Sequence, residues 1–356
     1  MTNVWSSELA KLVANSMLAQ RISSINSISA ICERTGANID EVAKSIGLDT
    51  RIGDKFLKAG VGFGGSCFKK DVLSLVYLAE SLGLPEVGEY WRQVVSINRY
   101  QRDRFVTRVI ECLNNTLKGK KVTILGYAFK KNTDDTRESP AIEAIKTLLE
   151  EGPSEIAVFD PCCNPLVVRE ELGQLLGDGV VADGGPVSVH SCAEKACHLS
   201  NAIVIMTDFD EFRTASVPPP SALTAQETPR HEDPRPFATS KPSENELLSL
   251  QRYLATTVVG ELDPRSNDPL QRFRGEPGCD AECPDCKQSA TAEGRSFAPG
   301  LGTAGTVEYR PGERLDWAKI AYHMRKPRWV FDGRGVVQAE DLAKLDVSVE
   351  TIGRQS

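Results

Sequence analysis

Long apolar segments are absent from this sequence. No run of about 18 apolar residues occurs in its 356 residues, so we expect no transmembrane helix. Basic residues are not in excess either, because 42 Lys and Arg stand against 49 Asp and Glu, a net charge of −7. A protein that binds duplex nucleic acid needs a basic surface. The composition therefore argues against nucleic acid and membrane as partners.

A secretory signal is also missing from the start of the sequence. Residues 1–12 contain no basic region followed by an apolar stretch, which is the pattern of a signal peptide. The ten cysteines are scattered and do not form the spacing of a small disulfide scaffold. These features together predict a cytoplasmic protein with reduced thiols.

The first hundred residues are predicted to be mostly helical. Apolar residues recur at spacings of three to five between about Ser6 and Arg34, as on one face of a helix. This helix also carries an unusually polar run at 23–29, so we expect it to pack against other helices. Capping and stop signals predict further helices over about 38–47, 67–82 and 87–113.

The pattern changes at Lys120. Continuous apolar runs occupy about 121–126, 155–161, 202–206 and 329–333, with a helical segment over 140–151. Such runs alternating with helices predict an α/β fold with a Rossmann-like parallel sheet covered on both faces. Ligands of these sheets bind at the carboxyl ends of the strands.

The rhythm of strands and helices is lost between about Val217 and Pro311. Twelve of the twenty prolines lie between Pro218 and Pro299, and such a composition buries too little apolar surface to order itself. We interpret 217–311 as a long disordered insertion with one short helix near 244–254. The predicted domains are 1–100, 101–216, the insertion 217–311, and 312–356.

Three cysteines within this insertion have near-metal spacing: Cys279, Cys283 and Cys286. A fourth ligand is not obvious, and three ligands leave a structural zinc site incomplete. Whether they bind a metal stays open, and no metal is assigned to the chain.

The segment Gly62 to Asp71 is the richest in chemistry. Its three glycines allow a close backbone approach to a ligand, and they precede Cys67 at the start of a predicted helix. Lys69 and Lys70 follow, and the positive helix terminus favours a thiolate. This arrangement is typical of an activated nucleophile beside an anion. The alternative is a glycine-rich turn with a buried, inert cysteine.

Three segments resemble the UDP-glucose/GDP-mannose dehydrogenase family, and within it the UDP-glucose 6-dehydrogenases of the eukaryotic type. They are 5–15, 62–71 and 126–139, and the resemblance covers about 2–212 and 315–353. It implies a helical central dimerisation domain followed by a Rossmann-like UDP-binding domain. It also implies the four-electron oxidation of UDP-glucose to UDP-glucuronate, with NAD as cofactor.

The resemblance assigns a catalytic set. Cys67 is the nucleophile, which forms a thiohemiacetal and then a thioester. Lys11 and Asn15 lie one helical turn apart and stabilise oxyanion charge, and Asp71 positions water or the lysine for hydrolysis. Without the resemblance, Lys11 is a solvated surface lysine and Asp71 a helix acid stabilised by the dipole.

The resemblance also implies ligand contacts and an oligomer, since Arg51 resembles a residue that reaches the sugar from a neighbouring subunit. The substrate-binding candidates are Lys11, Asn15, Arg51, Lys58, Phe63, Gly64, Phe129, Lys130 and Arg334. The cofactor-binding candidates are Cys67, Phe68, Lys69, Lys70 and Arg137. Phe63 is expected to offer a flat contact, and Arg334 to clamp phosphate; a surface turn residue is the alternative for Arg334.

The sequence departs from the family at its start and in the insertion. The family's N-terminal nucleotide-binding domain is not found in it, nor are the glutamate and threonine that serve there as base and water ligand. We therefore expect a truncated form, a fragment or a degenerate copy that does not turn over alone. The alternatives are a non-catalytic UDP-sugar-binding and oligomerisation module, or a related dehydrogenase acting for instance on GDP-mannose.

Overall fold

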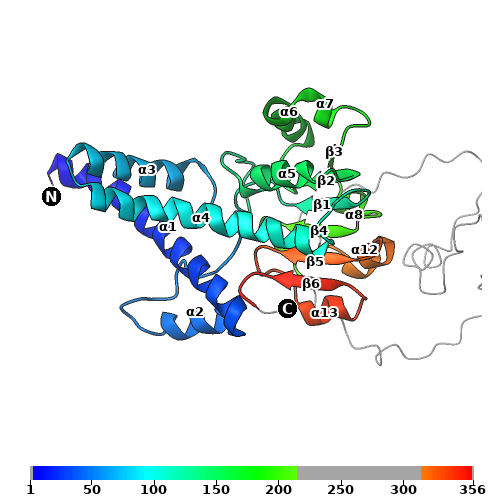
Figure 1. Ribbon diagram of the computed structural model, residues 1–356, viewed down its shortest axis with the longest axis horizontal. Coiled ribbons are helices and arrows are strands. Elements are labelled where there is room, and N and C mark those ends of the chain that lie inside the picture. Colours follow the sequence, from blue (N-terminus) through cyan, green and yellow to red (C-terminus); the bar gives the residue numbers. More distant parts are fainter. Residues whose placement is uncertain (1–2, 215–313, 355–356) are drawn as a thin grey trace, which may run out of the picture. The chain divides into compact units, whose positions relative to one another are not determined.

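The computed structural model describes residues 3–214 and 314–354, all of which belong to one compact unit. The expected disordered insertion 217–311, with its predicted helix near 244–254 and its three cysteines, lies outside the described residues. The helical part comprises α1 (Val4–Thr35), α2 (Ile39–Gly47), α3 (Ser66–Ser81) and α4 (Pro85–Cys112). The α1, α3 and α4 helices pack against one another (Figure 1).

Six parallel strands form one sheet in the order β3-β2-β1-β4-β5-β6. The strands are β1 (Lys121–Leu125), β2 (Glu155–Phe159), β3 (Val187–His190), β4 (Ala202–Ile205), β5 (Trp329–Asp332) and β6 (Ser348–Thr351). The helices among them are α5 (Pro140–Glu150), α6 (Pro165–Leu176), α7 (Asp178–Val181), α8 (Ala193–Cys197), α12 (Trp317–His323) and α13 (Ala339–Ala343), with a 3₁₀ turn η1 (Asp210–Phe212).

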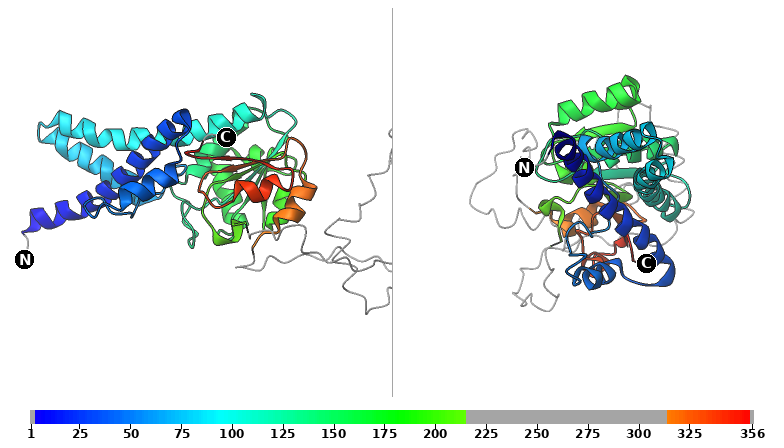
Figure 2. Two further views of the ribbon diagram at one scale, coloured as in Figure 1. Left: turned by 90° about the horizontal axis from the view of Figure 1, so that it is seen from below. Right: turned by 90° about the vertical axis from the view of Figure 1, so that its left-hand side faces the viewer.

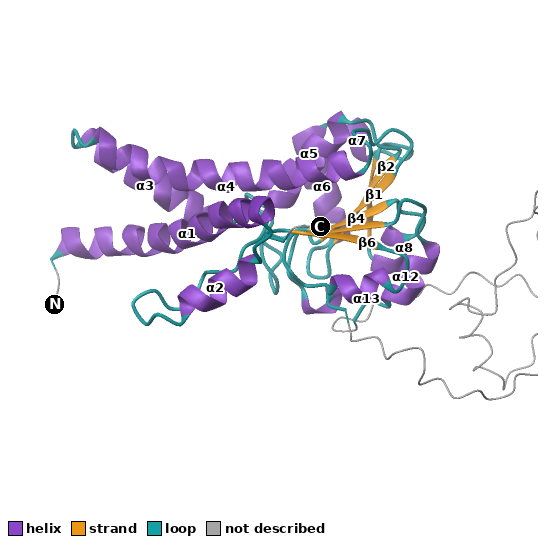
Figure 3. Cartoon of the chain, turned by 60° about the horizontal axis from the view of Figure 1, so that its bottom comes forward, coloured by secondary structure: helices purple, strands orange, loops and turns teal. Residues whose placement is uncertain are grey.

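The strand order reverses between β1 and β4. Parallel crossovers are right-handed. The helices that connect strands within one half of the sheet therefore cover one face, and those within the other half cover the opposite face. Figure 3 shows α8, α12 and α13 together on one side of the strands and α5 on the other. Such a reversal opens a crevice beyond the carboxyl ends of the two strands, where α/β proteins bind their ligands.

Local sequence explains where the sheet-covering helices begin. Ser139 and Asn164 accept hydrogen bonds from the backbone N–H groups at the starts of α5 and α6, and a proline follows each of them at the first helical position. The central strands are fully buried, and every side chain of β4 is in the core. The prediction of an α/β fold with a Rossmann-like parallel sheet is therefore confirmed.

The predicted helices are confirmed to within two residues at each end, but the edge strands β3 and β6 were not predicted. Each is four residues long and only partly buried, so its apolar run is broken by polar side chains. An edge strand needs less apolar surface than a central one, which hides it from a search for continuous apolar runs.

The α4 helix joins the helical part to the sheet. Val94 packs with Ala19 and Val72 of the helices, whereas Phe105 and Val109 belong to the core under the sheet. Figure 2 shows α4 as one long cyan helix that extends from the helical part to the strands.

The polar run of α1 is accounted for by this packing. Ser23, Asn26 and Ser29 are buried, and the Ser23 hydroxyl donates to the Val94 carbonyl of α4 at 2.7 Å. The expectation that this helix packs against others is confirmed.

Residues 350–353, in and after β6, also bind the helical part. The Ile39 N–H donates to the Gly353 carbonyl at 3.0 Å, and the Gly353 N–H donates to Glu33 at 2.7 Å. The Arg108 Nε of α4 donates to the Glu350 carboxylate of β6 at 2.8 Å. Among the described residues, no helix has the length and apolar character that crossing a membrane requires.

Candidate active site

The glycine loop, residues 60–65, connects the helical part to the carboxyl edge of the sheet. Four of its backbone N–H groups have acceptors on four different segments. The donor and acceptor pairs are Gly60 to Asn26 Oδ1 (2.9 Å), Val61 to the Gly333 carbonyl (2.9 Å), Phe63 to Asn98 Oδ1 (2.9 Å) and Gly65 to the Arg137 carbonyl (3.0 Å). The loop is thus held from α1, α4 and the turns after β1 and β5.

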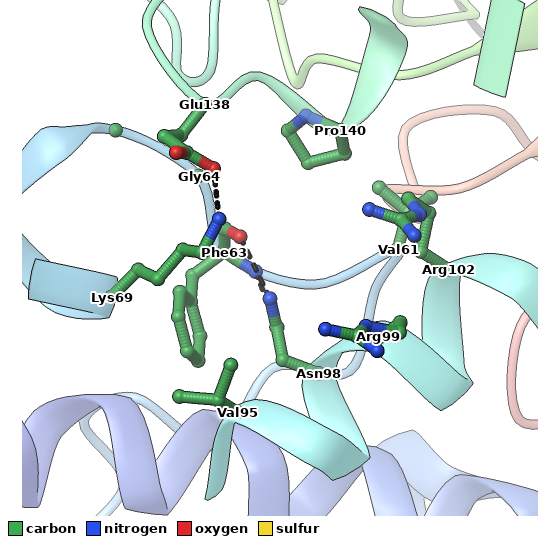
Figure 4. Close-up of a pocket in the computed structure, with 11 residues that line it drawn as sticks. Val61, Phe63, Gly64, Lys69, Val95, Asn98, Arg99, Arg102, Glu138 and Pro140 are labelled. Atoms are coloured by element: carbon green, nitrogen blue, oxygen red, sulfur yellow. Dashed lines mark hydrogen bonds and ion pairs between the residues drawn. The ribbon is translucent and has the colours of Figure 1, made fainter. Parts of the chain in front are cut away.

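The carbonyl groups of the glycine loop are held in the same way. Side-chain donors bind three of them: Gln101 Nε2 binds Gly60 (3.0 Å), Arg334 Nη1 binds Gly62 (3.0 Å) and Asn98 Nδ2 binds Phe63 (2.9 Å). Figure 4 shows the Asn98 amide facing the backbone of Phe63. Seven backbone groups of the loop therefore have partners within the protein, which restrains its conformation.

Glycine is required at two points of the loop. Gly62 has φ of +107°, and a Cβ there would lie 2.6 Å from Asn98 Oδ1. Gly65 has φ of +81°, and its Cβ would lie 2.8 Å from the Phe129 ring. Positive φ and contacts this close both exclude a side chain. The glycines therefore allow the loop to pack closely against Asn98 and Phe129 of the protein itself, and not only against a ligand.

Cys67 lies in the first turn of α3, directly after the glycine loop, and it is exposed. The alternative of a buried cysteine is therefore wrong, and the role of Cys67 as a nucleophile stays a prediction. Lys69 and Lys70 follow in the same turn, and the Lys69 ammonium pairs with Glu138 at 2.7 Å (Figure 4). The sulfur is thus accessible at the positive end of a helix.

A buried carboxylate organises the other catalytic candidates. The Asp71 side chain is 1% exposed, and its Oδ2 accepts from Lys11 Nζ and Asn15 Nδ2, both at 2.5 Å. Its Oδ1 is also buried but has no hydrogen-bond partner among the described residues. Lys11 is therefore not a freely solvated lysine, although its side chain is 59% exposed.

The electrostatics of this cluster keep Asp71 ionised. Burial by itself raises the pKa of the Asp71 carboxyl, but the hydrogen bonds from Lys11 and Asn15 and the charges of Lys11 and Lys70 outweigh it. The pKa of Asp71 is therefore below its ordinary value. Because Asp71 follows Cys67 by four residues on one helix, the sulfur and the cluster lie on the same face of α3.

Arg334 follows β5, as the sequence analysis expected, but it is not a free surface residue. Its Nε donates to the Met206 carbonyl at 2.7 Å and its Nη1 to Gly62, which leaves a buried Nη2 without a partner among the described residues. Burial lowers the pKa of Arg334, while the nearby Asp208 and Asp332 raise it. The two N–H groups of Nη2 therefore have no acceptor among the described residues.

Several substrate candidates lie around the glycine loop. The Phe129 ring contacts Gly65, and the Lys130 ammonium lies over that ring, 5.2 Å from its centre. Lys58 is exposed and runs beside the Arg334 turn, since a Cβ on Gly335 would lie 3.6 Å from the Lys58 Cε. The structure thus brings Lys58, Gly64, Phe129, Lys130 and Arg334 to one place.

Phe63 and Arg51 behave differently from the other candidates. The Phe63 ring is 9% exposed and packs edge to face on Phe68, 5.6 Å between centres, so it is part of the core. Its role as a flat substrate contact stays a prediction. Arg51 is exposed and bound to Asp49 at 2.6 Å, and within the described part of the chain its hydrogen bonds and ion pairs reach none of the other candidates.

The cofactor candidates surround the sulfur. Arg137 lies close enough to Cys67 to interact with it electrostatically, and its guanidinium pairs with Asp135 at 2.8 Å. The Arg137 carbonyl holds Gly65, as described above. Sequence reasoning did not find the amides Asn26, Asn98 and Gln101, and their only signal was a polar residue on an otherwise apolar helix face.

The fold and the site together define a class of protein. An exposed thiol and a buried carboxylate that binds a cation and an amide lie on α3, directly after the glycine loop. Arg334 binds the same loop from the carboxyl edge of a doubly wound parallel sheet. This combination is typical of an enzyme that binds an anionic ligand and uses a covalent step.

Comparison with known families agrees with this class. Two domain models match: the central domain of the UDP-glucose/GDP-mannose dehydrogenase family over residues 5–100, and the UDP binding domain of the same family over residues 123–228. The chain belongs to the UDP-glucose/GDP-mannose dehydrogenase family.

Individual relatives are similar over the same region. The UDP-glucose 6-dehydrogenase of Drosophila melanogaster is 52% identical over 212 residues, which is 59% of this chain and 44% of that protein. That of Mus musculus is 55% identical over 216 residues, 60% of this chain and 43% of that protein. The chain thus spans less than half the length of these relatives.

A solved structure supports the fold alone. The UDP-D-ManNAc dehydrogenase of Pyrococcus horikoshii superimposes with a TM-score of 0.54 at 18% sequence identity, and the match covers 99% of this chain and 53% of that one.

The two hydrogen bonds between Asn98 and the backbone of Phe63 predict the effect of replacing Asn98. In Asn98→Leu the N–H and carbonyl of Phe63 lose their partners, and each buried group left unpaired costs about 1–3 kcal/mol. Urea unfolding should show a free energy of unfolding lower by about 2 kcal/mol. In the control Gln93→Leu, the replaced side chain is exposed and hydrogen-bonds to Glu89 on the same helix, so the free energy of unfolding should change by less than about 0.5 kcal/mol. Equal effects would show that the amide does not hold the loop.

The lowered pKa of Asp71 predicts a dependence of stability on pH. A group whose pKa is lower in the folded state contributes stability that is complete above its unfolded pKa of about 3.9 and is lost as the pH falls through the folded pKa. The stability difference between the parent and Asp71→Asn should therefore be constant near neutral pH and shrink below about pH 4. Urea unfolding across this range measures it, with Glu41→Gln as an exposed control. A difference that does not change with pH would contradict the account.

Proposed function

We propose that this chain carries the nucleophile and the UDP-sugar site of an NAD-dependent UDP-glucose 6-dehydrogenase. Such an enzyme oxidises the primary alcohol of UDP-glucose to the carboxylate of UDP-glucuronate. One observation carries the proposal: the exposed Cys67 shares a helix face with the buried Asp71, which collects Lys11 and Asn15. A thiol is needed for the second oxidation, because an acid forms from an aldehyde only after a nucleophile has been added.

The match to a UDP binding domain and the names of the relatives support a UDP-sugar as ligand. A diphosphate is bound by cations and by backbone donors, and the proposed contacts include such cations. The buried Nη2 of Arg334 has no partner among the described residues, and Lys58 lies beside the Arg334 turn. Phe129 and Lys130 complete the same edge of the sheet, at its switch in strand order.

The proposed first covalent step is the addition of the Cys67 sulfur to the aldehyde carbon at the sugar C6. The carbonyl oxygen becomes an oxyanion, which Lys11 and Asn15 stabilise. The Lys11 ammonium and the Asn15 amide each donate one hydrogen to Asp71. An ammonium has three donors and an amide two. Both side chains therefore keep a donor for the substrate while Asp71 holds them in place.

The adduct of Cys67 and the aldehyde is a thiohemiacetal, which becomes a thioester when its C6 hydrogen leaves as a hydride; bound NAD would be the acceptor of that hydride. The proposed last step is the hydrolysis of this thioester. Asp71 is ionised because its pKa is lowered, and its Oδ1 is a buried acceptor without a partner among the described residues. An attacking water can donate a hydrogen to that oxygen and be oriented toward the acyl carbon. The water then displaces the Cys67 thiolate, which is free for another cycle.

The residues beside Cys67 fit the phosphate end of a dinucleotide. Lys70 is exposed in the first turn of α3, and Arg137 lies within electrostatic range of the sulfur. When bound, NAD would supply the hydride acceptor for both oxidations. Lys70 and Arg137 would hold its phosphates, and Phe68 and Lys69 would flank it.

A homo-oligomer formed through the central helices is part of the same proposal. Trp5 of α1 and Tyr77 of α3 are 85% and 74% exposed, and large exposed aromatic side chains are typical of interaction surfaces. The expectation of a cytoplasmic location stays a prediction.

The proposal predicts that UDP-glucose protects Cys67 from alkylation. Cys67 and Cys162 are both exposed, so the second serves as an internal control within the same protein. Brief treatment with iodoacetamide, read by peptide mass spectrometry, should label Cys67 several-fold more slowly in the presence of UDP-glucose, while the labelling of Cys162 is unchanged.

The possible results separate the alternatives. Protection by GDP-mannose as strong as that by UDP-glucose would place the chain in the other branch of its family. Calorimetric binding of UDP-glucose without any protection of Cys67 would favour a non-catalytic binding module. Neither binding nor protection would overturn the proposed function.

A further inference from the structure

Residues 48–56, which we name the arm, connect α2 to the segment before the glycine loop. One side chain from outside the arm holds its backbone. Arg21 of α1 donates through all three of its guanidinium nitrogens: Nε to the Lys55 carbonyl (2.9 Å), Nη1 to Ile52 (2.9 Å) and Nη2 to Gly53 (2.8 Å). Each of these three nitrogens has its own acceptor. A planar guanidinium with a fixed fork of donors suits such a role, and an ammonium does not.

The arm cannot hold its shape by burial. Leu48 is 80% exposed, and Ile52 and Phe56 are each 43% exposed. Nothing lies within 4 Å of a Cβ built on Gly53, so no side chain packs on that side of the arm. Phe56 has φ of +62°, which is unusual for a residue with a side chain. Hydrogen bonds therefore hold the arm: the Ile52 and Gly53 N–H groups donate to the Asp49 carbonyl at 2.9 and 2.8 Å, and Arg21 supplies the three bonds from outside the arm.

Arg51 sits at the centre of this exposed segment. Its own guanidinium is held by Asp49 through two contacts, Nε at 3.0 Å and Nη2 at 2.6 Å, and its N–H also donates to Asp49 at 2.9 Å. Asp49 therefore orients the side chain, while Arg21 fixes the backbone on which both residues stand.

We propose that Arg21 is the positioning residue for Arg51, which it places by locking residues 52, 53 and 55 of the arm onto α1. The inference rests on the proposed function, because it takes Arg51 as a contact to the sugar nucleotide. Arg21 itself touches no ligand. It acts through Arg51 alone, so its replacement matters only where Arg51 is present.

A double-mutant cycle tests this dependence. UDP-glucose binding is measured by calorimetry on the full chain for the parent, Arg21→Met, Arg51→Ala and the double variant. Loss of one charge-assisted contact is expected to weaken binding about tenfold. Arg21→Met should weaken it by a similar factor in the parent and by less than twofold in the Arg51→Ala background. The control Arg92→Met removes an arginine that pairs with Glu80 and Glu89, away from the arm, and should leave the affinity unchanged.

A second measurement needs no ligand. Trypsin cleaves after Arg51 and Lys55, so cleavage within the arm reports its order. It should be several-fold faster in Arg21→Met than in the parent or in Arg92→Met, whereas Arg21→Lys should resemble Arg21→Met because one ammonium cannot reach three carbonyls.

The possible results distinguish a failure of the proposed function from a failure of the role inferred for Arg21. Failure of the parent to bind UDP-glucose overturns the proposed function. Unchanged trypsin cleavage in Arg21→Met overturns the inference whatever the binding result. An equal loss of affinity from Arg21→Met with and without Arg51 also overturns it, because Arg21 would then act by another route.

Discussion

The glycine loop is the constraint on which the rest of the structure depends. Its backbone is bound at Gly60, Val61, Phe63 and Gly65 by four different segments of the chain. A helix could not occupy this position, because it would use the same backbone groups for its own hydrogen bonds. A strand would use them to pair with a neighbouring strand. The loop is therefore the joint at which helices and sheet meet, and the nucleophile follows it directly.

This joint explains why polar residues are buried in an otherwise apolar interface. Asn26 and Gln101 are fully buried, and burying an amide is costly unless it is hydrogen-bonded. Here the loop backbone supplies partners for Asn26 Oδ1 and Gln101 Nε2, while Asn26 Nδ2 has no partner among the described residues. Arg334 also binds the loop, because its Nη1 donates to the Gly62 carbonyl, and its buried Nη2 has no partner among the described residues. A ligand at this edge meets groups that are already in place.

The fold could be predicted from sequence where one interaction dominates. The buried strands β1, β2, β4 and β5 appear as continuous apolar runs, and proline and capping residues mark the helix starts. The short edge strands β3 and β6 could not be found, because they are only partly buried. Of the site, the pairing of Lys11 with Asn15 follows from helical spacing. Their meeting with Asp71 came only from the resemblance, since 56 residues separate Asn15 from Asp71. The role of Arg21 was hidden for the same reason: its acceptors are backbone carbonyls, which leave no pattern in the sequence.

Backbone hydrogen exchange of the free chain tests the central claim most directly. If the glycine loop is formed before a ligand binds, the amides of Gly60, Val61, Phe63 and Gly65 should exchange slowly without UDP-glucose, as do those of α4. Exchange of these four amides at the rate of an unstructured peptide, with protection only after UDP-glucose is added, would show that the ligand builds the joint and would contradict the account.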